Sequence, residues 1–171
     1  MTGPSDQSRP IFRYTVNIGA GEQEVASLVP PDLVFEHGLC TEAILGVIGS
    51  DPGNSEGVAP DRFQENPAFV QFLQEVISDH VYGLDDLVRE GKRHRNGHIY
   101  LIDGRTPQPD GSVPPEDIIG AVDVEDGSLV PGSYEHNPNH RLLTEDGFFL
   151  LPPQLEAVLD REVRARCTRP R

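Results

Sequence analysis

Apolar and polar residues alternate near the start of the chain. In residues 11–18 every second side chain is apolar, and the residues between them are polar. A period of two is typical of a half-buried β-strand, whose apolar face here carries Phe12, Tyr14, Val16 and Ile18. The Gly-Ala-Gly sequence at 19–21 predicts a hairpin turn, followed by a second strand over residues 24–29.

Two segments have apolar residues at helical spacing. Residues 39–48 are apolar at positions 39, 40, 43, 44, 47 and 48, which predicts a buried helix that ends at Gly49. The stronger segment follows Asn66, a natural N-cap, and Pro67, which fits the first helical turn. The residues that recur at helical spacing along it are Phe69, Phe72, Leu73, Val76, Ile77 and His80. We expect this helix, over residues 66–81, to be the most buried one.

An apolar residue, two prolines and a polar residue occur in this order three times. Proline fits the start of a helix because its missing N–H would have no partner there. In two copies the next residue is acidic, which favours the positive end of the helix dipole. We therefore expect a helix or a helical turn at Pro30-Pro31, at Pro114-Pro115 and at Pro152-Pro153. The third copy opens a final helix that runs to about residue 166.

The rest of the chain alternates between short elements and loops. We expect a helix over 84–91, a strand over 98–102, a hairpin over 118–130, a loop over 132–147 and a short strand over 148–151. The hairpin is the clearest of these, because Asp126-Gly127 is the sequence of a type I′ turn.

The order of these elements predicts an α+β fold. It is a single domain with a mainly antiparallel sheet, about three to four helices and long Gly/Pro-rich loops. We expect the domain to cover residues 11–166. Residues 1–10 are expected to be a flexible tail and residues 167–171 a basic C-terminal tail.

Charge is distributed unevenly along the chain, whose net charge is −14. Residues 89–95 and 160–171 each carry +3, whereas residues 1–88 carry −11 and residues 96–159 carry −9. An acidic body repels nucleic acids and anionic membranes and attracts basic proteins. The chain also has no nucleic-acid-binding motif and no long apolar run. We expect a cytoplasmic protein whose partner is another protein, with a basic partner favoured, and neither nucleic acid nor membrane.

Polar residue types that can perform chemistry concentrate between positions 94 and 141. The candidate polar cluster is Asp103, Arg105, His136, His140 and Arg141. Asp103 and Arg105 follow an apolar strand, where they could bind a polar ligand or satisfy the loop backbone and each other.

Metal and cofactor sites are not expected. His94 and His98 are four residues apart, as are His136 and His140, but turn residues interrupt both pairs. Cys40 and Cys167 belong to no CxxC or Cys/His pattern, so we expect neither a zinc site nor a disulfide scaffold. Cys40 is interpreted as a buried small apolar residue on the helix predicted over 39–48.

Two functional hypotheses remain. The first is a non-catalytic acidic intracellular protein that acts by binding another protein, as an immunity, regulatory or accessory factor. The alternative is a small enzyme or ligand-binding protein that uses the polar loop face formed by the five cluster residues. An enzyme should gather these side chains in one concave pocket, whereas a binding protein should present a broad acidic or apolar surface.

Overall fold

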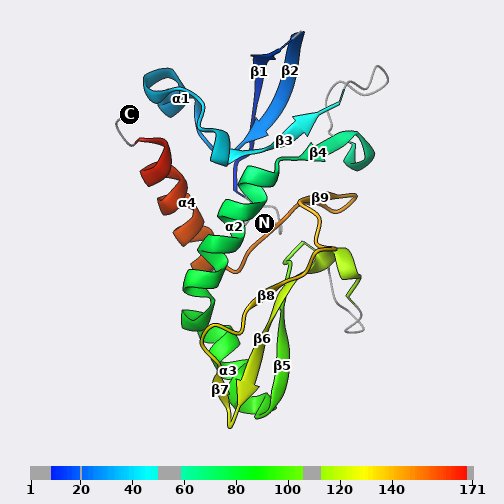
Figure 1. Ribbon diagram of the computed structural model, residues 1–171, viewed down its shortest axis with the longest axis vertical. Helices are drawn as coiled ribbons and strands as arrows, with labels where there is room; N and C mark the ends of the chain where they lie inside the picture. The colour runs from blue at the N-terminus through cyan, green and yellow to red at the C-terminus, as the bar shows by residue number, and fades with distance from the viewer. Residues whose placement is uncertain (1–8, 20, 50–58, 106–112, 169–171) are drawn as a thin grey trace, which may run out of the picture. The chain divides into compact units, whose positions relative to one another are not determined.

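The computed structural model describes residues 9–19, 21–49, 59–105 and 113–168 (Figure 1). The α+β class is confirmed: the described residues form four α-helices and strands that pair antiparallel. The chain divides into two compact units. The first comprises residues 1–73 with 159–171, and the second comprises residues 74–158.

A four-stranded antiparallel sheet organises the first unit. Its strands are β1 (Phe12–Ile18), β2 (Gly21–Ser27), β3 (Ile44–Ile48) and β4 (Phe63–Glu65), in the order β1-β2-β3-β4. The hairpin predicted at residues 19–21 is confirmed, although β2 spans Gly21–Ser27 rather than residues 24–29. Across the hairpin the Arg13 guanidinium donates to both Glu24 carboxylate oxygens, at 2.7 and 2.8 Å.

The helix predicted over residues 39–48 is wrong. The segment forms a 3-10 turn, η2 (Thr41–Ala43), followed by strand β3. β3 is a central strand, paired with β2 and β4, and its residues are buried or half-buried on both faces, which accounts for its continuous apolar run. Gly46 permits this close pairing, because a Cβ atom there would overlap the Gln64 carbonyl oxygen. Such a run resembles a helical stripe when only the apolar positions are considered.

All three proline pairs begin helical structure, as predicted. They open helix α1 (Pro31–His37), the 3-10 turn η5 (Pro115–Asp117) and helix α4 (Pro153–Cys167). Helix α2 (Pro67–His80) also follows its predicted N-cap, because Asn66 Oδ1 accepts the Ala68 N–H at 3.2 Å. The Asn66 amide nitrogen donates in addition to the carbonyls of Thr41 and Ile44, at 2.9 Å each.

Short turns complete the described elements of both units. The 3-10 turn η3 (Pro60–Arg62) leads into β4. The 3-10 turn η4 (Val81–Gly83) separates α2 from helix α3 (Asp85–His94). The helix predicted over 84–91 is therefore present and extends to His94. Its last turn carries Lys92, Arg93 and His94, where the helix dipole favours positive charge.

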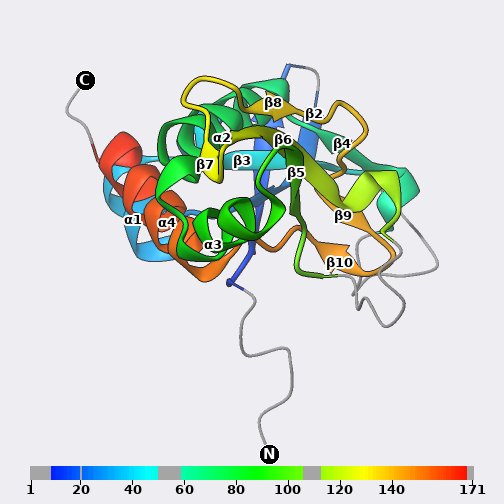
Figure 2. The same ribbon diagram turned by 90° about the horizontal axis from the view of Figure 1, so that it is seen from below.

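The second unit contains an antiparallel sheet and a separate short hairpin. The sheet has β5 (Gly97–Ile102), β6 (Ile118–Glu125) and β7 (Ser128–Leu129) in that order, and β8 (Glu135–His136) also pairs with β6. Helix α3 packs against β5 and β7 (Figure 2). The hairpin is β9 (Leu143–Thr144) with β10 (Gly147–Phe148). The predicted loop over 132–147 thus contains two short strands, and the strand predicted over 148–151 lies at Gly147–Phe148.

The turn between β6 and β7 has the predicted type I′ character. Asp126 has φ 50° and Gly127 has φ 81°, so both central residues adopt the left-handed conformation. We expect Gly127→Val to destabilise the protein by about 1–3 kcal/mol, because a β-branched residue is strained at positive φ. At roughly 2–4 °C per kcal/mol for a chain of this size, thermal unfolding followed by circular dichroism will detect this loss.

Ser128→Val is the matched control for this prediction. It places the same side chain at the next residue, an exposed position in strand β7 where a β-branched residue is favourable. Equal melting temperatures for the two variants would contradict the requirement for glycine at this turn.

Candidate functional site

Three of the five residues in the predicted polar cluster meet in the interior of the second unit. Asp103 directly follows β5, Arg105 lies two residues later, and His140 lies in the segment between β8 and β9. Their side chains are 0%, 1% and 2% exposed, respectively. Such complete burial of ionisable and polar groups requires that each one be paired or hydrogen-bonded.

The Asp103 carboxylate uses both of its oxygens. Oδ2 lies 2.9 Å from His140 Nε2, within hydrogen-bonding distance. Oδ1 accepts the backbone N–H groups of Arg105 at 3.1 Å and of Leu150 at 2.8 Å. The backbone is fixed as well, because the Gly104 N–H donates to the Leu150 carbonyl at 2.9 Å. Asp103 therefore ties the end of β5 to the segment that follows β10.

The Arg105 guanidinium is bonded on all three of its nitrogens. Nε donates to Asp117 Oδ1 at 2.8 Å and lies 3.6 Å from Asp103 Oδ2. Each terminal nitrogen donates to two backbone carbonyls: Nη1 to Leu142 and Gly147 at 3.1 Å each, and Nη2 to Glu116 at 3.1 Å and Arg141 at 2.6 Å. Five N–H donors thus have five acceptors, which is the full capacity of an arginine side chain.

Asp117, in η5, is a member of this network that was not predicted from the sequence. Its side chain is 1% exposed, and its backbone carbonyl accepts the Asp103 N–H at 2.7 Å. Its second oxygen, Oδ2, is buried without a hydrogen-bond partner among the described residues. The available signal was an acidic residue between a predicted helical turn and an apolar strand. That signal is weak, because an acidic residue at a helix start normally faces solvent.

The two other predicted residues occupy exposed positions. Arg141 contributes its backbone carbonyl to the network. The residue itself is exposed, although it follows the buried His140 directly in sequence. His136 is exposed on β8, where it pairs in register with Gly120 of β6. The structure therefore brings Asp103, Arg105 and His140 together and leaves the side chains of His136 and Arg141 at the surface.

The geometry of the buried network is that of a structural support. An acid, base or nucleophile must reach a substrate, but these side chains are shielded from solvent and the guanidinium has no donor left to offer. The network joins the β5 end, η5, and the segments on both sides of the β9–β10 hairpin. No group of three or more His, Cys, Asp or Glu side chains among the described residues could hold a metal ion.

Tyr134 forms a second polar contact inside the same unit. Its hydroxyl donates to Gln74 Oε1 at 2.5 Å, and its backbone N–H donates to the Tyr82 hydroxyl at 3.0 Å. The pKa of Tyr134 is raised well above its usual range, mainly by burial and to a smaller extent by the nearby Tyr82. The phenol therefore stays neutral. Tyr134 packs over Gly120, where a Cβ would come within 2.6 Å of its ring. This tyrosine is therefore a packed hydrogen-bond donor rather than an acid–base group.

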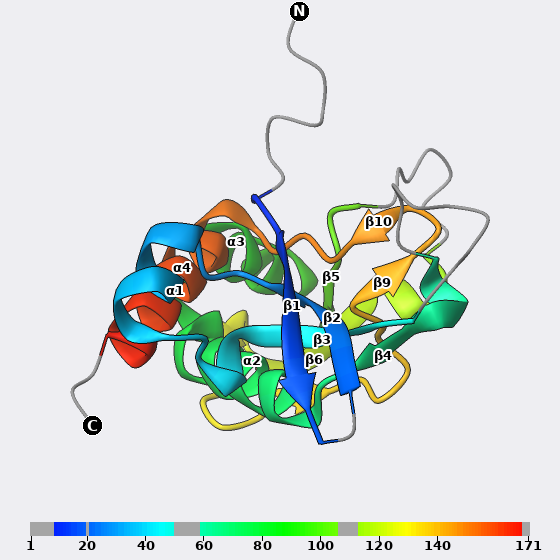
Figure 3. The ribbon, with the colours of Figure 1, turned by 90° about the horizontal axis from the view of Figure 1, so that it is seen from above.

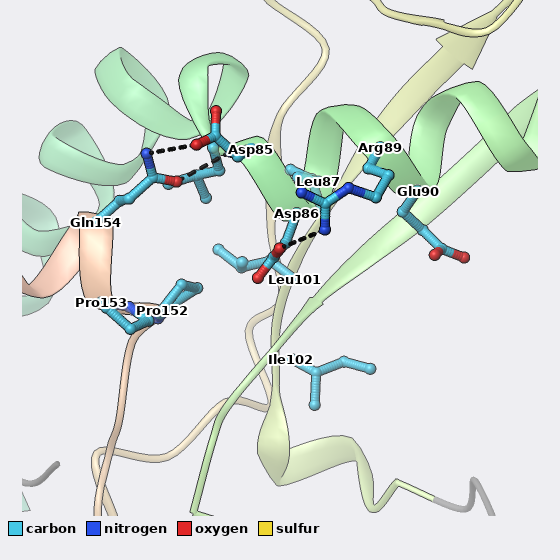
Figure 4. A pocket seen from close by; sticks show the side chains of 11 residues that line it. Asp85, Asp86, Leu87, Arg89, Glu90, Leu101, Ile102, Pro152, Pro153 and Gln154 are labelled. Atoms are coloured by element: carbon cyan, nitrogen blue, oxygen red, sulfur yellow. Dashed lines mark hydrogen bonds and ion pairs between the residues drawn. The ribbon is translucent and has the colours of Figure 1, made fainter.

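An accessible groove lies elsewhere in the second unit (Figure 4). It has a volume of about 440 Å³ and is formed by α3, the end of β5 and the first residues of α4. Most of its lining is apolar: Leu84, Leu87, Leu101, Ile102, Pro152 and Pro153. Its charged and polar lining residues are Asp85, Asp86, Arg89, Glu90 and Gln154.

Local hydrogen bonds hold the polar side of this groove in place. Gln154 Oε1 accepts the Asp85 backbone N–H at 2.9 Å, which satisfies one of the free donors at the start of α3. The Gln154 amide nitrogen also donates to the Asp85 carboxylate at 3.4 Å. Arg89 pairs with Asp86 at 3.1 Å, one helical turn away. Three carboxylates therefore share the groove with one guanidinium that is already paired.

The groove residues were not predicted as a site. Asp85 and Asp86 stand out in the sequence as neighbouring acidic residues between Leu84 and Leu87, but the other apolar lining residues come from positions 101, 102, 152 and 153. Only the packing of α3 against β5 brings Leu87 and Leu101 into one lining.

Among the described residues, no helix has both the length and the apolar character needed to cross a lipid bilayer. Comparison of the chain with models of protein families, with curated proteins and with solved structures gives no match.

Proposed function

We propose that the chain is a non-catalytic binding protein whose groove in the second unit docks a short segment of a basic partner protein. The observation that supports this most is the composition of the groove. Apolar side chains form most of its lining, and the carboxylates of Asp85, Asp86 and Glu90 outnumber the single Arg89 guanidinium (Figure 4). Apolar contacts provide affinity in such a site, and the carboxylates select positive charge.

The charge of the surrounding unit supports the same choice of partner. Residues 74–158 contain 16 Asp and Glu against 6 Lys and Arg, which gives −10, whereas the rest of the chain carries −4. The negative electrostatic potential of such a unit accelerates the approach of a basic partner and slows that of nucleic acids. The occupant is therefore a segment with an apolar side chain flanked by lysine or arginine.

The buried network supports a binding role over a catalytic one. Its members are the residue types that an enzyme would need, yet Asp103, Arg105 and His140 are used internally. The groove contains carboxylates and one paired arginine, and no histidine, cysteine, serine or tyrosine is among the described residues that line it. Its volume of about 440 Å³ lies within the usual range of ligand pockets, which suits a short segment of a partner.

A selection of peptides tests the proposal and does not require the partner to be identified. We expect random peptides displayed on phage to be enriched, on the purified chain, in sequences that combine lysine or arginine with an apolar residue. Synthetic versions, measured by fluorescence anisotropy, should lose at least about tenfold in affinity for the variant Asp85→Asn/Asp86→Asn/Glu90→Gln. Their association rate should also fall as salt shortens the Debye length to about 8–10 Å and below.

The matched control removes the same charge from another surface. Asp123→Asn/Glu125→Gln/Asp126→Asn changes three exposed carboxylates of β6 and the following turn. Retained affinity in this control would assign binding to the groove. Equal losses in both variants, a salt-independent association rate, or enrichment without positive charge would each contradict the proposal.

A further inference from the structure

The two cysteines of the chain lie next to each other in the first unit. Cys40 directly precedes η2, and Cys167 is the last residue of α4, so 126 residues separate them in sequence. Both are free thiols, and the Cys40 thiol is within hydrogen-bonding reach of the Cys167 thiol. The end of α4 lies beside the segment that contains η2 (Figure 1, Figure 3). The two cysteines are therefore neighbours in space although they are far apart in sequence.

Neighbouring contacts fix both sides of this thiol pair. Arg166, the residue before Cys167, donates from Nη1 to Glu42 Oε2 at 3.1 Å. The same guanidinium lies 4.9 Å above the centre of the Phe72 ring. On the other side, the Cys40 carbonyl accepts the Ala43 N–H at 3.1 Å. These contacts hold the two segments that carry the thiols, and none of them involves a sulfur atom.

The two thiols differ in their access to solvent. Cys40 is partly exposed, whereas Cys167 is 7% exposed. The pKa of Cys167 is raised well above its ordinary value, mainly by burial and second by the Cys40 thiol. Glu42 raises this pKa further, and Arg166 lowers it. Cys167 is therefore protonated at neutral pH, and a small oxidant in solution meets Cys40 first.

We propose that Cys40 and Cys167 are a redox modification site that forms a reversible intramolecular disulfide with a small disulfide such as oxidised glutathione. The Cys40 thiolate attacks one glutathione sulfur, forms a mixed disulfide and releases the first glutathione as a thiolate. Cys167 then loses its proton and attacks the Cys40 sulfur, which breaks the mixed disulfide and releases the second glutathione. Two protein thiols are oxidised, one oxidised glutathione is reduced, and the two protons end on the released thiolates.

The disulfide links η2 to the end of α4, both of which belong to the first unit. It closes a loop through most of the chain, which restricts the unfolded state more than the folded one. Oxidation should therefore raise the melting temperature by roughly 5–15 °C. This modification does not depend on the groove of the second unit.

The test uses the purified full chain, reduced and then placed in glutathione buffers of increasing oxidising power. We expect intact mass spectrometry to show the loss of two hydrogens, and thiol titration of the denatured chain to fall from two thiols to none. Melting of the oxidised and reduced chains, followed by circular dichroism, should show the expected rise in melting temperature. Added reductant should reverse all three changes.

Single variants separate the two steps. Cys167→Ala should stop at the mixed disulfide and gain one glutathione, because the resolving thiol is absent. Cys40→Ser should stay unmodified under the same conditions, because Cys167 is buried. Three results would overturn the proposal: two thiols that persist in oxidising buffer, a doubly glutathionylated chain, or disulfide-linked dimers in place of the closed monomer.

Discussion

Arg105→Met should lower the free energy of unfolding by roughly 3–5 kcal/mol, the usual cost of removing one partner from a buried ion pair. The substitution keeps an unbranched side chain but leaves the Asp103 and Asp117 carboxylates buried without their cation. It also removes the donors to four backbone carbonyls. Urea denaturation followed by circular dichroism at neutral pH measures this loss.

Arg141→Met is the matched control for this effect. It makes the same change at an exposed residue whose backbone, rather than its side chain, contributes to the network. We expect a change within about 0.5 kcal/mol, as for most surface substitutions. If Arg105→Met fails to fold, Arg105→Lys provides a milder test, because it keeps the charge and loses the planar fork. Similar stabilities for Arg105→Met and Arg141→Met would contradict the structural role of the network.

The second large effect is expected at Phe72, in the first unit. Phe72 is 4% exposed, and its ring centre lies 6.5 Å from that of Phe69. Phe72→Ala should cost about 3–5 kcal/mol, because it leaves a cavity in a packed core. It also removes the ring beneath the Arg166 guanidinium, a contact that adds stability when it is shielded from water.

Phe35→Ala provides the comparison, since Phe35 is 93% exposed on α1. The same deletion at this position should change the free energy of unfolding by no more than about 0.5 kcal/mol. Urea titrations of the two variants measure the difference directly. A loss below about 1 kcal/mol for Phe72→Ala would mean that its ring is not part of the core.

Local sequence determined most of the secondary structure. The Asn66-Pro67 start of α2, the three proline pairs and the Asp126-Gly127 turn were all predicted correctly. Each depends on interactions within a few residues: a side-chain cap, a fixed φ angle or a positive φ angle. Such preferences act in any tertiary context, so they can be recognised from the sequence before the fold is determined.

Pairing with strands that are distant in sequence decided the secondary structure of residues 39–48. Their apolar positions fit both a buried helix and a buried strand, and only the pairing of β3 with β2 and β4 distinguishes the two. Pairing with other strands also decided the short strands β8 and β9, which fall in the segment predicted to be a loop. Segments of two residues carry no periodicity, so their pairing follows from the packing around them.

The candidate functional residues also separate into those that the sequence identified and those that only the tertiary structure brought together. The sequence by itself identified Asp103, Arg105 and His140 as chemically capable residues and established the acidic charge of the chain. Only the tertiary structure joined them to Asp117 in a saturated interior network, assembled the groove beside α3 and placed Cys40 against Cys167. The physical reason is that burial and proximity arise from contacts between residues far apart in the chain, whereas a sequence pattern reports preferences over a few neighbours.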